Sequence, residues 1–138
     1  MKKRSFLAGG VLLAVVVVLT PAGAQDNKAP TIKQVMKKLN SGPNSMTATI
    51  GKELQDDPPI WDDIKKETQE YVKMADALGK NDPPKGEKDS WSKLSKDYAE
   101  NAKALDEATQ KKDKKAALAA HKKITTSCMA CHTEHRKK

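Results

Sequence analysis

The sequence predicts an all-α protein, and three observations lead to this prediction. After residue 24, apolar residues recur at steps of three and four, which is the period of an amphipathic helix. No segment alternates polar and apolar residues as a half-buried strand would. The breaks between the periodic segments are short, which favours helices that neighbour one another and run antiparallel. We therefore expect an antiparallel four-helix bundle.

Residues 1–24 have the composition of a secretory signal peptide. Three cations at residues 2–4 precede an uncharged run from Ser5 to about Thr20, and small residues stand at Ala22 and Ala24. A membrane anchor is the alternative, but a spanning helix needs roughly 20 apolar residues and this run is shorter. We expect cleavage after Ala24, export across the inner membrane to the periplasm, and one mature domain of residues 25–138 with no stable membrane span.

The chain is basic, with 26 Lys and Arg residues against 18 Asp and Glu residues and a net charge of +8. Most lysines alternate with acidic residues at helical spacing, which is typical of a solvated helix surface. No pattern resembles a groove-reading motif, so nucleic acid is not an expected partner. From residue 25 onward the chain has only thirteen Leu, Ile and Val residues, which predicts a thin apolar core.

The first helix is expected to begin after Thr31, because Thr31 and Gln34 have the spacing of a capping box. It should end near Asn40, since Gly42 and Pro43 follow, and resume near Asn44. The apolar stripe of this region is Ile32, Val35, Met36, Leu39, Met46, Ile50 and Leu54.

Three longer helices should follow. Asp57 can cap the second and Pro58 suits its first position, and Gly79 can end it. Residues 80–89 form the clear loop, after which Ser90 opens the third helix. Asp113 opens the last helix, which runs into the terminal segment CMACHTEHR.

The segment CMACH contains both cysteines of the chain. On a helix, residues three and four apart share a face, so Cys128, Cys131 and His132 should point to the same side. A c-type haem needs this set, because two thiols add across its vinyl groups and the histidine binds the iron. C-x-x-C-H is the attachment signature of such a haem.

Three other kinds of site are alternatives to haem for these residues. A thioredoxin-like redox pair would follow a strand, and none is expected here. A zinc site would need Cys128, Cys131, His132 and His135, and four ligands within eight residues of one helix do not readily surround a metal. A disulfide between residues three apart would close a very small loop and stabilise little.

With CMACHTEHR at the end of a four-helix chain, the sequence resembles the class II c-type cytochromes, which include the cytochromes c prime and their low-spin relatives. The family pattern runs from the ligand histidine to an arginine four residues later, matched by His132 and Arg136. The resemblance implies one covalent haem c and places Arg136 near the porphyrin or a propionate, although a cation at the helix end also suits the helix dipole. The chain departs from the family at His135, where an aromatic is usual, and at the Gly42–Pro43 break.

The resemblance implies that His132 is the proximal iron ligand and that a methionine near the start of the first helix is the distal one. Met36, residue 12 of the mature chain, matches that position. Met36 could instead be core, and Met46 is a weaker candidate. His121 lies about 16 Å from His132 along a helix, too far to bind the same iron, and is expected at the surface or an edge.

The function expected on these grounds is that of a monohaem one-electron carrier, not of an enzyme. Redox proteins with acidic faces are its expected partners, and the resemblance implies that a homodimer can form. The alternatives are a five-coordinate cytochrome c prime that binds nitric oxide or carbon monoxide, and a haem-free helical protein with a metal-binding or structural role.

Overall fold

The computed structural model describes residues 29–137, so the expected signal peptide and its cleavage site lie outside the described residues. Within this range the chain is all-helical and has no strand, as predicted. The five helices are α1 (Ile32–Asn40), α2 (Met46–Glu53), α3 (Trp61–Leu78), α4 (Lys88–Gln110) and α5 (Lys114–His135). The helix count differs from the expected four, because the break at Gly42 and Pro43 makes α1 and α2 separate helices. None of the five is long and apolar enough to cross a membrane.

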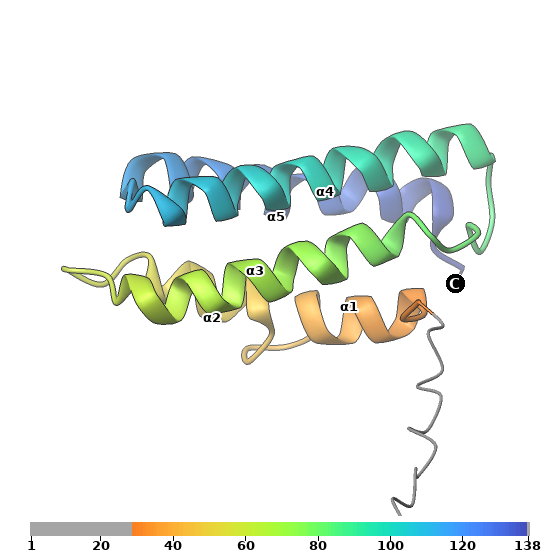
Figure 1. The fold of residues 1–138 in the computed structure, drawn as a ribbon. Helices are drawn as coiled ribbons and strands as arrows, with labels where there is room; N and C mark the ends of the chain where they lie inside the picture. The colour runs from red at the N-terminus through yellow and green to blue at the C-terminus, as the bar shows by residue number, and fades with distance from the viewer. Residues whose placement is uncertain (1–28, 138) are drawn as a thin grey trace, which may run out of the picture.

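Successive long helices alternate in direction. Figure 1 shows α3, α4 and α5 running back and forth, while α1 and α2 follow one another along α3 in the opposite direction. The α4 helix packs against both α3 and α5, and α2 packs against both α3 and α5. This arrangement places α2 against α5, whereas α1 packs on α2 and α3.

Two predicted helix starts are confirmed at the level of single hydrogen bonds. The backbone N–H of Gln34 donates to Thr31 Oγ1 at 3.3 Å, and the Gln34 side chain accepts from the Thr31 N–H at 2.8 Å. The Asp113 carboxylate accepts from the Ala116 N–H at 2.9 Å. These caps satisfy N–H groups that a helix leaves without internal partners.

The other two predicted starts are wrong by two or three residues. The α3 helix begins at Trp61 instead of Pro58, because the residue before a proline avoids the helical region and Pro58 precedes Pro59. The α4 helix begins at Lys88, before Ser90, since the Glu87 carbonyl already accepts from the Trp91 N–H at 3.1 Å.

The core is continuous and includes many small side chains. Eighteen hydrophobic residues are buried in the described range, and seven of them are alanines, five of which lie on α4 and α5. Alanines let these two helices approach closely. The larger buried side chains include Tyr71, Trp91 and Tyr98, which supply much of the area that the few aliphatic residues cannot.

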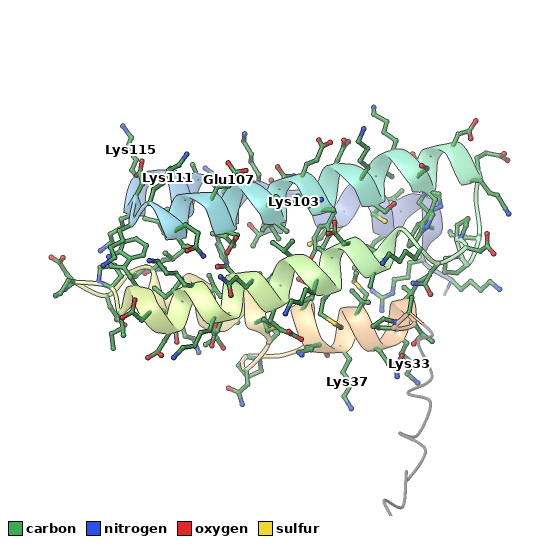
Figure 2. The ribbon with its side chains drawn as sticks, in the orientation of Figure 1. Lys33, Lys37, Lys103, Glu107, Lys111 and Lys115 are labelled. Atoms are coloured by element: carbon green, nitrogen blue, oxygen red, sulfur yellow. The ribbon has the colours of Figure 1, made fainter. Side chains whose placement is uncertain are left out.

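Lysines cover the outside of the helices, as predicted. Figure 2 shows Lys33 and Lys37 on α1 and Lys103, Lys111 and Lys115 toward α4 and the start of α5. All five are exposed. Several lysines on this surface face acidic groups, as where Lys103 Nζ lies 3.1 Å from Asp76 Oδ1.

The carboxyl groups of Glu53 and Glu67 lie in surroundings that disfavour their charged form. One carboxylate oxygen each of Glu53 on α2 and Glu67 on α3 is buried without a hydrogen-bond partner. Burial raises the pKa of both groups, and the nearby Asp63 raises them further. By contrast, the hydrogen bond from Lys38 to Glu70 lowers the pKa of Glu70.

Glu67→Gln should stabilise the protein at pH 7. A raised carboxyl pKa means that the folded state binds a proton more readily than the unfolded chain, so stability falls as the pH rises from 4.5 through the raised pKa. Removing the charge should raise the urea midpoint at pH 7, and the gain should shrink below pH 4.5. The matched variant Glu70→Gln should lower the midpoint at pH 7, because a lowered pKa contributes stability that is lost on acidification. Midpoints of Glu67→Gln that are unchanged at every pH would contradict this assignment.

The loop before α4 is tied to the end of α5. The His135 side chain is 2% exposed, and its Nδ1 lies 2.8 Å from the Lys85 carbonyl oxygen. Gly86 follows in a left-handed conformation with φ of +78°, and a Cβ on it would lie 2.9 Å from His135 Nδ1. Gly42 has a similar φ of +83°, but open space surrounds it.

Gly86→Ala should therefore destabilise the fold more than Gly42→Ala. Both alanines adopt a left-handed conformation at a cost of about 1 to 2 kcal/mol. Only the Gly86 variant also displaces the buried histidine, which should add about 1 to 3 kcal/mol. Urea unfolding followed by circular dichroism measures both losses, and equal losses would show that the His135 contact contributes nothing.

Candidate functional site

The motif CMACH lies on the second half of α5, in an unbroken helix that ends at His135. The helix therefore aligns Cys128, Cys131 and His132 along one side, as the spacing predicts. All three are half-buried, and the two thiols are free. The methionine between the cysteines points elsewhere, since Met129 is 72% exposed.

The two thiols have different neighbours. Cys128 Sγ lies 3.6 Å from the Ile124 carbonyl oxygen, one turn earlier, and the residue lines a cavity. Cys131 instead packs against the hydrophobic core. Burial raises the pKa of both thiols, and Glu134 raises that of Cys131 further. Both are therefore neutral thiols near pH 7.

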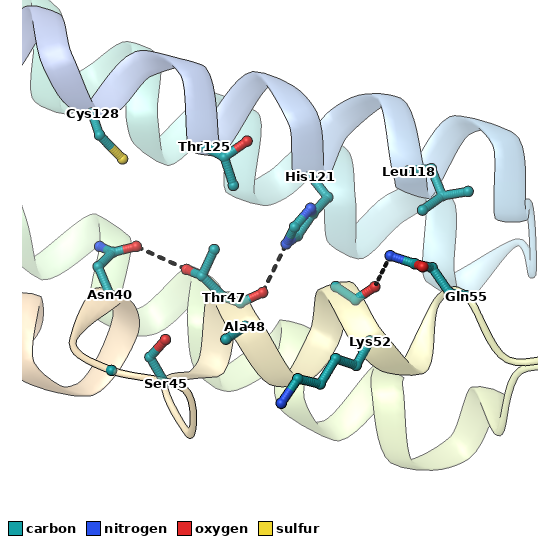
Figure 3. Close-up of a pocket in the computed structure, with 12 residues that line it drawn as sticks. Asn40, Ser45, Thr47, Ala48, Lys52, Gln55, Leu118, His121, Thr125 and Cys128 are labelled. Atoms are coloured by element: carbon teal, nitrogen blue, oxygen red, sulfur yellow. Dashed lines mark hydrogen bonds between the residues drawn. The ribbon is translucent and has the colours of Figure 1, made fainter.

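The cavity beside Cys128 lies between α2 and α5 and has a volume of about 530 Å³, within the range of roughly 300 to 1,000 Å³ usual for ligand pockets. Figure 3 shows the Cys128 thiol pointing from α5 toward Asn40 and Thr47. His121 also enters this space from α5. Cys131, His132 and Met36 are not part of its lining.

A hydrogen-bond network of side chains adjoins the cavity. The Tyr71 and Tyr98 hydroxyls are 2.5 Å apart, and Thr47 Oγ1 lies 2.8 Å from the Tyr71 hydroxyl. Asn40 Nδ2 donates to the Tyr98 hydroxyl at 3.0 Å, and Thr47 Oγ1 donates to Asn40 Oδ1 at 2.8 Å. Burial is the main cause that raises the pKa of both tyrosines, and Cys128 contributes to each shift. The network therefore joins α1, α2, α3 and α4 next to Cys128.

Met36 lies at the α1 end of this network. It is half-buried against the core, and its Sδ accepts from Asn40 Nδ2 at 3.7 Å. Met46 and Met74 also pack partly buried against the core. What distinguishes Met36 is its connection, through Asn40, to the tyrosine pair near Cys128.

Arg136 ends α5 and is exposed. Its backbone N–H donates to the His132 carbonyl oxygen at 3.2 Å. This position puts a cation at the carboxyl end of the helix, where the dipole favours it.

His121 and His135 form contacts that the sequence did not reveal. His121 was expected at the surface or an edge, but it is half-buried, with Nε2 2.8 Å from the Thr47 carbonyl oxygen. His135 packs edge-on against Trp91, with ring centroids 5.3 Å apart. Gly51 lets the His121 ring come close to α2, because a Cβ at this position would lie only 2.8 Å from the ring.

The zinc alternative would need His135 to join the cysteines. Its Nδ1 instead faces the Lys85 carbonyl and its Nε2 lies 3.2 Å from Ser90 Oγ. In residues 29–137 no group of three or more His, Cys, Asp or Glu side chains comes together as a metal site.

No protein-family model, curated protein or solved structure matches this chain. Two neutral thiols and an imidazole lie half-buried on one helix side, and Cys128 lines a cavity, which fits covalent attachment of a haem. Each S–H can add across a vinyl group with its hydrogen passing to carbon, so the attachment needs no oxidant.

The raised thiol pKa values make a prediction about reactivity. In protein made without haem maturation, the thiolate is the species that reacts with iodoacetamide, so alkylation at pH 7 should be slower than in urea-unfolded chain. The rate should rise with a midpoint above the ordinary pKa of 9.0. The pH profile, read by mass spectrometry for each cysteine, measures this. A midpoint at or below 9.0 would contradict the burial of the thiols.

Proposed function

We propose that this protein is an exported monohaem c-type cytochrome of class II, which carries single electrons in the periplasm. The observation that supports this most is the placement of Cys128, Cys131 and His132 on one side of α5, half-buried, with free thiols. A bound haem supplies an iron that alternates between Fe(III) and Fe(II). This is electron transfer with no substrate chemistry, so the protein is not proposed to be an enzyme.

The residues take distinct roles in this proposal. Cys128 and Cys131 anchor the haem as thioethers, and His132 is the proximal iron ligand. Met36 is the distal ligand, and histidine with methionine raises the reduction potential. Arg136, exposed at the end of α5, is available to a propionate.

The fold supports the family resemblance if α1 and α2 are counted as one interrupted helix. Together they run against the direction of α3, and α3, α4 and α5 then alternate (Figure 1). Four alternating segments are what the resemblance to a class II cytochrome implies, and in this proposal the last segment would carry the haem. The thin, alanine-rich core is consistent with an interior that a large apolar cofactor completes.

The exposed lysines suggest how the protein would meet its partners. They favour docking on redox proteins with acidic faces, since complementary charge speeds and orients encounters. Such docking should weaken as salt is added, because exposed charges are screened over about 10 Å at 0.1 M ionic strength. Formation of a homodimer is proposed only from the family resemblance.

A second candidate function is supported by the surroundings of Met36. Met36 does not line the cavity beside Cys128, the cysteine that would anchor a haem. If Met36 stays there when haem is bound, the iron is five-coordinate and binds nitric oxide or carbon monoxide, as in a cytochrome c prime.

Covalent haem should be detected when the full chain is exported in a host with cytochrome maturation. We expect a haem stain that survives a denaturing gel and a mass equal to the polypeptide after cleavage plus one haem. Cys128→Ala and Cys131→Ala together should abolish the stain. Colourless wild-type protein of polypeptide mass would exclude both haem functions and leave a haem-free helical protein.

Met36→Ala should then distinguish the electron carrier from the gas binder. For the carrier, the ferric protein shows a weak thioether-to-iron band that this variant loses, and its reduction potential falls because the thioether ligand is lost. Met74→Ala is the matched control, another half-buried methionine that packs on the same core. Rapid carbon monoxide binding by unmodified ferrous protein would favour the second function.

A further inference from the structure

Asn40 is the last residue of α1, and its side-chain amide is fully engaged. Nδ2 donates to the Tyr98 hydroxyl at 3.0 Å and lies 3.7 Å from Met36 Sδ. Oδ1 accepts from Thr47 Oγ1 at 2.8 Å. The amide therefore contacts three side chains, from α1, α2 and α4.

These contacts fix the orientation of the amide. Met36 and Asn40 are four residues apart and so share one side of α1. The oxygen is held by a donor on α2 and one N–H by an acceptor on α4, which leaves the other N–H directed at the sulfur. A half-buried network in which each group has a partner resists rotation, because turning the amide would break several bonds at once.

We infer that Asn40 is a positioning residue for the Met36 thioether, an inference that rests on the proposed function. The amide N–H occupies one lone pair of the sulfur and leaves the other free, which would be the pair donated to the iron of a bound haem. By drawing electron density from the sulfur, the amide would weaken donation to Fe(III) more than to Fe(II) and so would raise the reduction potential. Asn40 itself does not touch the iron.

The test compares haem-containing proteins that carry Asn40→Leu or Asn101→Leu. Leucine has the same number of side-chain heavy atoms as asparagine, branched at the same carbon, and has no N–H. Asn101 is a half-buried asparagine of α4 that takes no part in this network, so it is the matched control. Asn40→Leu should lower the reduction potential and weaken the thioether-to-iron band, and Asn101→Leu should leave both unchanged.

The same variant should also loosen the ligand. Losing a hydrogen bond of about 1 kcal/mol changes an equilibrium about fivefold, so the fraction of ferrous protein open to carbon monoxide should rise by that factor. Tyr98→Phe, which removes one partner of the amide but keeps the N–H that faces the sulfur, should give a smaller change.

A chemical readout checks the position of the sulfur directly. A mild methionine oxidant such as chloramine-T should convert Met36 to its sulfoxide faster in Asn40→Leu than in unmodified haem protein. Peptide mass spectrometry measures the rate against Met129, which is 72% exposed and serves as an internal reference.

The possible results distinguish a failure of the proposed function from a failure of the role assigned to Asn40. Colourless wild-type protein overturns the proposed function and this inference with it. Coloured protein with the thioether band, in which Asn40→Leu changes neither the potential, the band nor the oxidation of Met36, overturns the role of Asn40 alone. A loss of thermal stability without these changes would show that Asn40 is merely structural.

Discussion

The hydrogen bond between the Tyr71 and Tyr98 hydroxyls, which are 2.5 Å apart, is the centre of the side-chain network beside Cys128. It links α3 to α4, and Thr47 and Asn40 extend it to α2 and α1. An apolar core rich in alanine fixes helix positions only loosely, whereas a buried polar group must find its partner or lose about 1 to 3 kcal/mol. The network therefore adds directional contacts to the apolar packing of the short helices, immediately beside Cys128.

A second constraint acts on α5 itself. His121 lies seven residues before Cys128, and His135 three residues after His132. Each ring lies 2.8 Å from a backbone carbonyl of another segment, His121 from that of Thr47 and His135 from that of Lys85. The motif is thus held between two points of attachment, one to α2 and one to the loop before α4. A covalent cofactor on such a segment would be fixed relative to both ends of the molecule.

The proposed function asks for two properties that pull in opposite directions. The thiols must be accessible enough to react once, and the finished site must be dry enough for a stable ligand set. The two cysteines divide these needs, because Cys128 adjoins an open cavity that leaves its thiol accessible and Cys131 packs against the core, where water is excluded. Met36 and Asn40 stand on α1, the helix joined to this site through the tyrosines.

Local chemistry could be predicted from the sequence wherever the decisive contact spans a few residues. The caps at Thr31 and Asp113 and the break at Gly42 are of this kind, and so is the shared helix side of the motif cysteines. The start of α3 was missed because two adjacent prolines delay the helix, and that of α4 because Glu87 precedes the expected cap. Four of the contacts made by Asn40, His121 and His135 join residues that are 45 to 74 positions apart in the sequence. Only tertiary packing brings such residues together, since periodicity shows which side of a helix is inward but not which atom it meets there.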